Sequence, residues 1–287
     1  MILKLISQVF IFSLIAFFGW LFFTTLGNPL QEVYLSIATL SLIGFSFVLE
    51  RIFPQNEEWN KSQDDVIGDI GSFVLVFGII DGTLKWLSPL LLLAIIPNFG
   101  GNIALPLWVQ IIIATFLIEF GSWVSHWAHH RFQSLWALHM MHHSTERLYT
   151  LNNFRFHPLN HIVNYAAAFI PLLALGISAE ALLGYTALTM PILLLQHSNI
   201  GFKFGTLNYI FNTNTLHRWH HSAANNEGMC NFGRAFVLFD QIFKTFYFPS
   251  NLKVPNKIGL QSEDCSFPAA NHTLKQILWP FSKECCQ

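Results

Sequence analysis

Charged residues are scarce in this chain. Aspartate, glutamate, lysine and arginine make up 11% of its 287 residues, against about 25% in a typical soluble domain. The formal net charge is −1, which gives no indication of nucleic-acid binding. The four cysteines show no C-x-x-C spacing, so they predict neither a disulfide framework nor a thiolate metal site. G-x-G-x-x-G and H-E-x-x-H are also missing, so a dinucleotide fold and a metalloprotease-type site lack their signatures.

The chain instead contains long runs of apolar residues. Hydrophobic residues form 53% of the chain, and a membrane crossing needs about 20 of them in succession. Four runs precede the first histidine cluster, at 2–26, 33–48, 67–96 and 103–120. A later run, 162–195, is too long for one crossing, and Gly176-Ile177-Ser178 near its middle predicts a hairpin. We expect an all-α, polytopic membrane helical bundle.

The runs divide the chain into three parts within one integral membrane domain, residues 1–287. Residues 1–120 are expected to supply the N-terminal transmembrane helices. Residues 121–248 carry the histidines and the membrane hairpin, at about 162–196, and 249–287 form a C-terminal tail.

Basic residues predict which side of the membrane the histidines occupy. Arg51 follows the second run, Arg131 the fourth and Arg218 the hairpin. Successive crossings bring all three to one side, and lysine and arginine are enriched on the cytoplasmic side. The histidine-rich site is therefore expected there. Asp81 and Lys85 interrupt the third run and leave open a re-entrant break, which would change the number of crossings by two.

Twelve of the thirteen histidines lie between His126 and His221. Most fall in three groups: His126, His129 and His130; His139, His142 and His143; and His217, His220 and His221. Residues three and four apart share one helix face, so each group can direct two or three imidazoles to one point. Neutral imidazole is a common ligand of iron, zinc and copper. The pattern predicts a metal centre with enough ligands for two ions, but it does not choose the metal.

With their neighbours, these groups resemble the fatty acid hydroxylase / sterol desaturase superfamily of membrane di-iron oxygenases. The family's histidine pair spaced by three matches His126 and His130, and its two H-x-x-H-H motifs match the groups at 139–143 and 217–221. Arg155-Phe156-His157-Pro158-Leu159 resembles its R-x-H-P-L, His197-Ser198-Asn199 its H-S-N and Asn231-Phe232-Gly233 its N-Y-G. The resemblance covers roughly residues 45–248. Glu119, where aspartate is commoner, and Val124, where tryptophan is usual, indicate a divergent subgroup.

The resemblance implies an O₂-dependent oxidoreductase that hydroxylates or desaturates a membrane lipid, whether a sterol, a fatty acyl chain, an ether lipid or a carotenoid. It implies two iron ions held by His126, His130, His139, His142, His143, His157, His197, His217, His220 and His221. Because no flavin or dinucleotide motif is visible, the electrons are expected from a separate cytochrome b5-like or ferredoxin-like protein. The expected location is the endoplasmic reticulum or a bacterial inner membrane.

Several positions keep alternative roles. His157 either binds metal or holds the site through a hydrogen bond, His129 departs from the family spacing and is expected beside the metal, and His161 is expected to be structural. Four residues are candidates for orienting imidazole N–H groups, namely Glu119, Asn199, Asn231 and Asp240.

Rival functions are a zinc hydrolase, a metal transporter and a bis-histidine haem protein. A hydrolase of the H-E-x-x-H type would place a carboxylate beside the histidines as general base. A transporter would place ionisable residues inside crossing helices, and Asp81 and Lys85 are the only support for that. The histidines crowd at helix ends and in loops, which favours a fixed metal site.

Overall fold

The computed structural model describes residues 2–95, 103–224, 227–249, 254–261 and 266–282. Over these residues the chain is helical, and β pairing is limited to isolated bridges. The α-helices are α1 (Ile2–Thr24), α2 (Gln31–Ile52), α3 (Val66–Ser72), α4 (Asp81–Ile95), α5 (Leu107–Arg131), α6 (Gln133–His143), α7 (Pro158–Ala174), α8 (Ala179–Leu195), α9 (Asn214–His220), α10 (Leu238–Ile242) and α11 (Thr273–Leu278). Short 3₁₀ turns are η1 (Glu57–Asn60), η3 (Thr150–Phe154), η4 (Gly205–Tyr209) and η6 (Trp279–Phe281), and η2 (Phe73–Ile80) is a π-helix.

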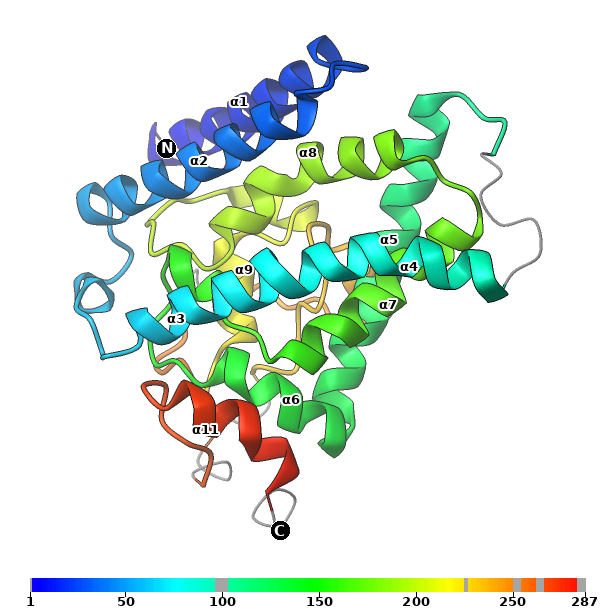
Figure 1. Ribbon diagram of the computed structural model, residues 1–287. Coiled ribbons are helices and arrows are strands. Elements are labelled where there is room, and N and C mark those ends of the chain that lie inside the picture. The colour runs from blue at the N-terminus through cyan, green and yellow to red at the C-terminus, as the bar shows by residue number, and fades with distance from the viewer. Residues whose placement is uncertain (1, 96–102, 225–226, 250–253, 262–265, 283–287) are drawn as a thin grey trace.

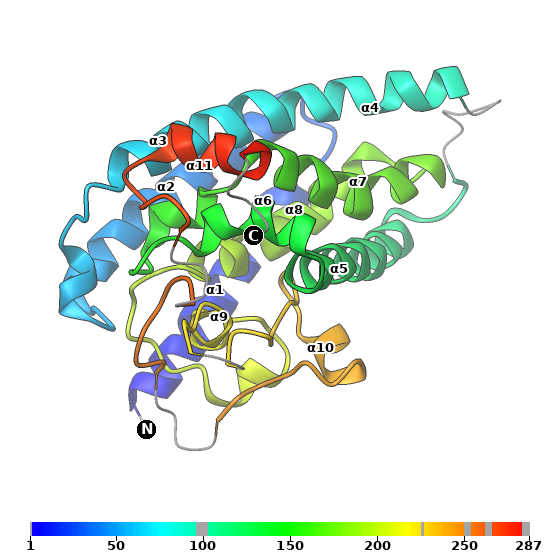
Figure 2. The ribbon, with the colours of Figure 1, turned by 90° about the horizontal axis from the view of Figure 1, so that it is seen from below.

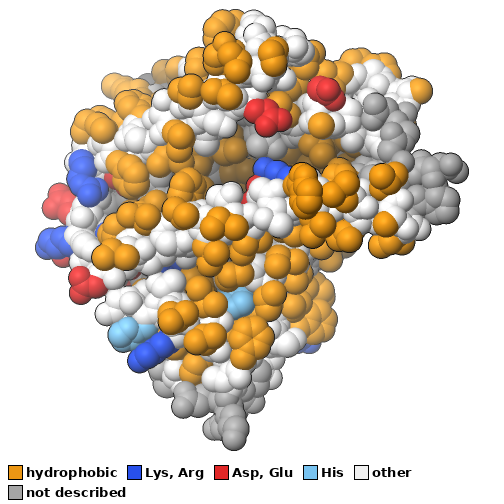
Figure 3. Space-filling model, in the orientation of Figure 1, with side chains coloured by type: hydrophobic (Ala, Val, Ile, Leu, Met, Phe, Trp, Pro, Cys, Tyr) orange, Lys and Arg blue, Asp and Glu red, His pale blue; other side chains and the backbone are white. Residues whose placement is uncertain are grey.

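Four helical segments are long and apolar enough to cross a membrane: α1, α2, the continuous segment α3–η2–α4, and α5. At most 39% of the most apolar stretch of each is buried inside the protein, so most of this apolar surface faces outward. Figure 3 shows that hydrophobic side chains cover much of one face, while charged side chains gather at the end of α2 and in the loop after it. These segments correspond to the four predicted runs, and the all-α membrane bundle is confirmed.

The third segment passes through Asp81 and Lys85 without a break, so the re-entrant alternative is wrong. Asp81 forms an ion pair with Lys85 (2.7 Å) and a hydrogen bond with His161 of α7 (3.1 Å). Pairing offsets the cost of ionisable groups inside a spanning helix, and the helix continues. The loop expected at 97–101 lies outside the described residues.

The predicted hairpin at 162–196 is present as α7 and α8. Gly176 (φ +74°) lies in the turn between them, and the Ser178 hydroxyl caps α8 by accepting the Ala181 N–H. α7 packs along α5, and the two backbones approach so closely at Gly121 that a Cβ there would lie 2.2 Å from the Ala167 carbonyl oxygen. Figures 1 and 2 show α5, α7 and α8 together beneath the α1–α2 pair.

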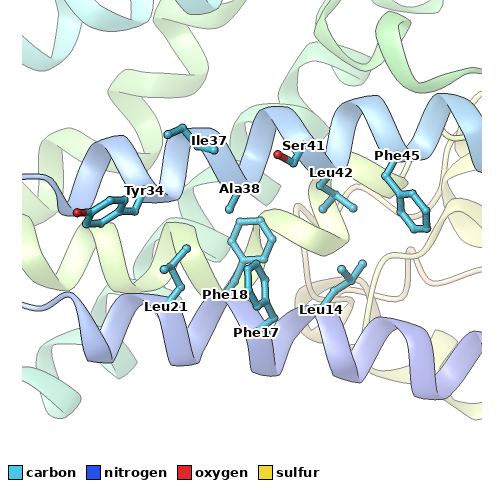
Figure 4. A pocket seen from close by; sticks show the side chains of 10 residues that line it. All are labelled: Leu14, Phe17, Phe18, Leu21, Tyr34, Ile37, Ala38, Ser41, Leu42 and Phe45. Atoms are coloured by element: carbon cyan, nitrogen blue, oxygen red, sulfur yellow. The ribbon is translucent and has the colours of Figure 1, made fainter.

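Two features of the fold lie outside the predicted histidine region. An open groove of about 420 Å³ lies between α1 and α2, with an apolar lining apart from Tyr34 and Ser41 (Figure 4). Within residues 249–287, the expected C-terminal tail, α11 and η6 lie against α6, with Gln276 fully buried and Trp279 nearly so. The end of the described chain is therefore part of the structure around the histidines.

Candidate metal centre

Helix ends bring the histidines together. His126 and His130 lie one turn apart near the end of α5, and His139, His142 and His143 occupy the last turn of α6. α9 contributes His217 and His220 and is followed by His221, while His197 follows the end of α8. Each pair spaced by three or four residues shares one face of its helix, as the sequence pattern predicted.

The nine histidines form two groups. The first contains His126, His130, His139, His143 and His220, and the second contains His142, His197, His217 and His221. Within each group the potential ligand nitrogens all lie within 4.8 Å of one another. Seven of the nine residues are buried, and His126 and His130 are half-buried. Each of the two adjacent groups could hold a metal ion.

The donor atoms fit metal ions. The buried Nε2 atoms of His126, His130 and His139 have no hydrogen-bond partner, although buried polar atoms are ordinarily satisfied. Ring nitrogens also face each other in pairs: His143 and His220 at 3.1 Å, His197 and His217 at 2.9 Å, and His217 and His221 at 3.2 Å. Facing nitrogens at this separation are suited to binding a shared cation.

Burial keeps these imidazoles neutral, which is the form that binds metal. It lowers the pKa of His142 to about 3. It lowers the pKa values of six further histidines well below the ordinary value, with the neighbouring imidazoles adding to the effect: His139, His143, His197, His217, His220 and His221. The site therefore disfavours protonation and favours a bound cation.

Backbone carbonyls orient three of the imidazoles. The Nδ1 atoms of His126, His142 and His220 face the carbonyl oxygens of Phe232, Arg155 and Cys230 at 2.9, 3.1 and 2.9 Å. An Nδ1–H bonded in this way fixes the tautomer and leaves Nε2 as the metal-binding atom.

Two asparagines orient further histidines. Asn152 Oδ1 faces His197 Nδ1, and Asn160 Oδ1 faces His139 Nδ1, both at 2.8 Å. Both asparagines are buried. Sequence reasoning missed them because these contacts depend on how η3 and α7 pack against the histidines, and the sequence pattern carries no signal for that.

The four residues expected to orient imidazoles form hydrogen bonds with backbone groups instead. Glu119 accepts the N–H groups of Ala235 and Phe236 at 3.0 Å each, and Asp240 accepts those of Phe232 and Gly233 at 2.8 Å each. The two carboxylates therefore hold the loop whose Phe232 carbonyl faces His126. The side chains of Asn199 and Asn231 likewise bond to backbone groups of other loops, and none of these hydrogen bonds reaches an imidazole.

Four further histidines lie outside both groups: His129, His157, His161 and His272. His157 accepts the Leu159 N–H at Nδ1 (3.1 Å) and donates from Nε2 to the Ile277 carbonyl (2.9 Å), so both of its ring nitrogens have protein partners. His129 contacts the Ser125 carbonyl and the Asn160 amide, and His161 pairs with Asp81. Of the ten predicted ligands, His157 alone lies outside both groups, and its Nε2 bonds to a backbone carbonyl and faces no other imidazole.

Comparison with known proteins identifies the same region. The fatty acid hydroxylase family model matches residues 111–245, the stretch that contains all nine grouped histidines. The ornithine lipid hydroxylase OlsE of Rhizobium tropici is 30% identical over 265 residues, covering 90% of this chain and 78% of the relative. No solved structure matches the chain.

Proposed function

This chain belongs to the fatty acid hydroxylase family, and from that premise we propose that it is a membrane-bound di-iron enzyme that uses dioxygen to hydroxylate a lipid. The observation that carries the proposal is the set of nine imidazoles in two adjacent groups, with the potential ligand nitrogens of each group within 4.8 Å of one another. Imidazole is a suitable ligand for iron, and nitrogen-rich sites with open positions serve dioxygen chemistry.

In this proposal the five-histidine group holds one iron ion and the four-histidine group holds the other. When bound, the ions supply dioxygen reduction and removal of hydrogen from an unactivated C–H bond. The chain supplies neutral ligands, the carbonyl and asparagine contacts that fix their tautomers, and burial that excludes water. Desaturation, the alternative outcome in the family, would follow from loss of a second hydrogen.

The proposed substrate is a polar membrane lipid. The name of the bacterial relative states that it hydroxylates ornithine lipid, so ornithine lipid is the first substrate to test. The second histidine group lies close to the third span, which suits a substrate from the bilayer: Phe156 stacks on His142 with ring centroids 4.2 Å apart, and the ring centroids of Phe156 and Phe77 of that span are 6.3 Å apart. Sterols, fatty acyl chains, ether lipids and carotenoids are the alternative substrates.

Electrons are proposed to come from a separate cytochrome b5-like or ferredoxin-like protein, since the sequence has no dinucleotide motif of its own. The proposed location is a bacterial inner membrane, with the histidines on the cytoplasmic side. Two rivals have weaker support. The two groups contain histidines alone, without the carboxylate that a zinc hydrolase uses as general base, and Asp81, which could have marked an ion path, is paired with His161.

The test is the metal content of protein purified in mild detergent after iron-replete expression, together with the lipids of the expressing cells. We expect about two irons per chain, a spectrum that changes on anaerobic reduction and again with dioxygen, and a lipid that has gained one oxygen atom. His142→Ala should lose the product, whereas His272→Ala, which changes an exposed histidine outside both groups, should keep it. Stoichiometric zinc that iron does not replace, with no oxygen consumption, would overturn the proposal and favour a hydrolase.

A further inference from the structure

The end of the described chain has an apolar outer side. Leu274, Leu278 and Phe281 are 69%, 56% and 69% exposed. Their spacing of four and then three residues places them on one side of α11 and η6. We propose that this side contacts the lipid bilayer, so that residues 273–281 lie at the membrane surface as an interfacial segment. Lys275 in the same segment is exposed and belongs to a residue type found at that boundary.

The inner side of the segment fixes its orientation. The Gln276 side chain, fully buried, donates to the Ser144 hydroxyl (3.0 Å) and the Pro268 carbonyl (2.8 Å) and accepts from the Arg155 guanidinium (2.7 Å). Trp279 packs in a cluster with Met140 and other apolar residues. The apolar side formed by Leu274, Leu278 and Phe281, here called the stripe, therefore cannot turn inward without breaking buried hydrogen bonds.

The stripe adjoins a surface that already faces lipid. Gly68 of α3 lies so close to Thr273 that a Cβ at this glycine would be 2.2 Å from the threonine hydroxyl oxygen. α3 begins the third membrane-spanning segment, and its neighbouring Ile67 and Ile70 are 86% and 48% exposed. Figures 1 and 2 both show α11 beside α3. Continuity with this span identifies the bilayer as the partner, rather than a second copy of the chain or an electron donor.

The test measures which medium surrounds the stripe. A nitroxide is attached at Leu278→Cys after Cys265, Cys285 and Cys286 are changed to serine, and the protein is placed in lipid nanodiscs. A matched label at Asn256→Cys, an exposed residue of the 254–261 loop, reports a water-facing position. We expect dissolved oxygen to relax the Leu278 label severalfold more strongly, relative to a water-soluble nickel chelate, than it relaxes the Asn256 label.

Two outcomes would overturn the proposal. Equal access of the nickel chelate to both labels would place the stripe in water, and exclusion of both reagents from the Leu278 label would indicate a protein partner. A second label at Leu274→Cys guards against a local effect of one substitution, and an unfolding temperature equal to that of the unlabelled protein verifies the fold. Because no readout is enzymatic, the result is independent of the proposed hydroxylase function.

Discussion

Asn160 touches two histidines with the two ends of its side-chain amide. Its Oδ1 faces His139 Nδ1 at 2.8 Å, and its Nδ2 donates to His129 Nε2 at 3.1 Å. The first contact fixes the tautomer that leaves His139 Nε2 for the metal. We expect Asn160→Ala to weaken metal binding by the five-histidine group about 10–100-fold, while the four-histidine group keeps its affinity.

Metal titration of the purified protein against a competing chelator checks this prediction. The matched control is Asn164→Ala, one turn further along α7, because Asn164 accepts a hydrogen bond from Ser125 and from no histidine. An equal loss of affinity in both variants would mean that packing of α7 matters and that the contact with His139 does not.

Single residues differ in how well their roles could be predicted from sequence. Spacing alone places His139, His142 and His143 on one helix turn, and the structure brings them into the two groups; ligation itself stays a prediction. Asn152 and Asn160 have no such spacing, because their partners are set by the packing of separate elements. His157 matches a family motif, yet the contact that occupies its Nε2 comes from Ile277, about 120 residues later.

At the scale of elements, one carboxylate joins α2 to the second histidine group. Oε1 of Glu50, which is fully buried, accepts the Thr150 N–H (2.7 Å), the Thr150 hydroxyl (2.9 Å) and the Asn199 N–H (2.9 Å). Thr150 precedes Asn152 by two residues, and Asn199 follows His197 by two. Glu50 therefore fastens both chain segments that meet in the Asn152–His197 hydrogen bond.

Removing that acceptor should destabilise the protein. Glu50→Ala leaves three buried donors without a partner, and each unsatisfied group costs about 1–3 kcal/mol. We expect a clear fall in the thermal unfolding temperature in detergent and weaker metal binding by the four-histidine group. Glu50→Gln keeps an acceptor oxygen and should lose less. Glu32→Ala, an exposed position in the first turn of the same helix, is the control, and a loss there as large as in Glu50→Ala would contradict the assignment.

A second link between elements predicts a pH dependence. Burial by itself would raise the pKa of Asp65, but two hydrogen bonds and the charge of Arg147 outweigh it and hold the pKa below its ordinary value. The folded state thus binds the Asp65 proton more weakly than the unfolded chain. The stabilisation is present above about pH 4, the unfolded pKa, and is lost as the pH falls further.

Asp65→Asn should lower the free energy of unfolding by about 3 kcal/mol near pH 7, because it leaves the buried Arg147 charge unpaired. The difference from the wild type should shrink below about pH 4. Thermal unfolding measured across this range checks both expectations. The control is Asp64→Asn, since Asp64 is exposed and its left-handed backbone (φ 59°) suits asparagine. A difference that stays constant with pH would exclude titration of Asp65.

The helices could be predicted from sequence where a long apolar run defines them. The long apolar runs gave the spanning helices and the α7–α8 hairpin, because burial in a bilayer selects for uninterrupted hydrophobicity. The break considered at Asp81 is absent since His161, 80 residues later, pairs with it. α11 was not predicted for the same reason: its inner contacts, such as Gln276 with Arg155, join positions that no local pattern connects.

At the scale of the whole molecule, the two histidine groups join parts of the chain that are distant in sequence. The first group contains residues of α5, α6 and α9. The second contains residues of α6 and of α9 with the position just after it, together with His197, which follows α8. A bound ion therefore crosslinks these parts in the folded state alone. An ion present at 1,000 times its dissociation constant stabilises the folded state by about 4 kcal/mol.

Removing the metal and replacing it with zinc separates stability from chemistry. Chelation should lower the thermal unfolding temperature of the wild type, because the stabilisation by binding is lost and buried imidazoles remain unsatisfied. Zinc accepts imidazole ligands but has no redox chemistry, so zinc should restore the unfolding temperature without restoring lipid hydroxylation, and iron should restore both. Unfolding temperatures and lipid products of the stripped, zinc-loaded and iron-loaded protein decide the matter. Hydroxylation by the zinc form would exclude an iron-dependent reaction. An unfolding temperature that does not change on chelation would show that the histidines hold no ion.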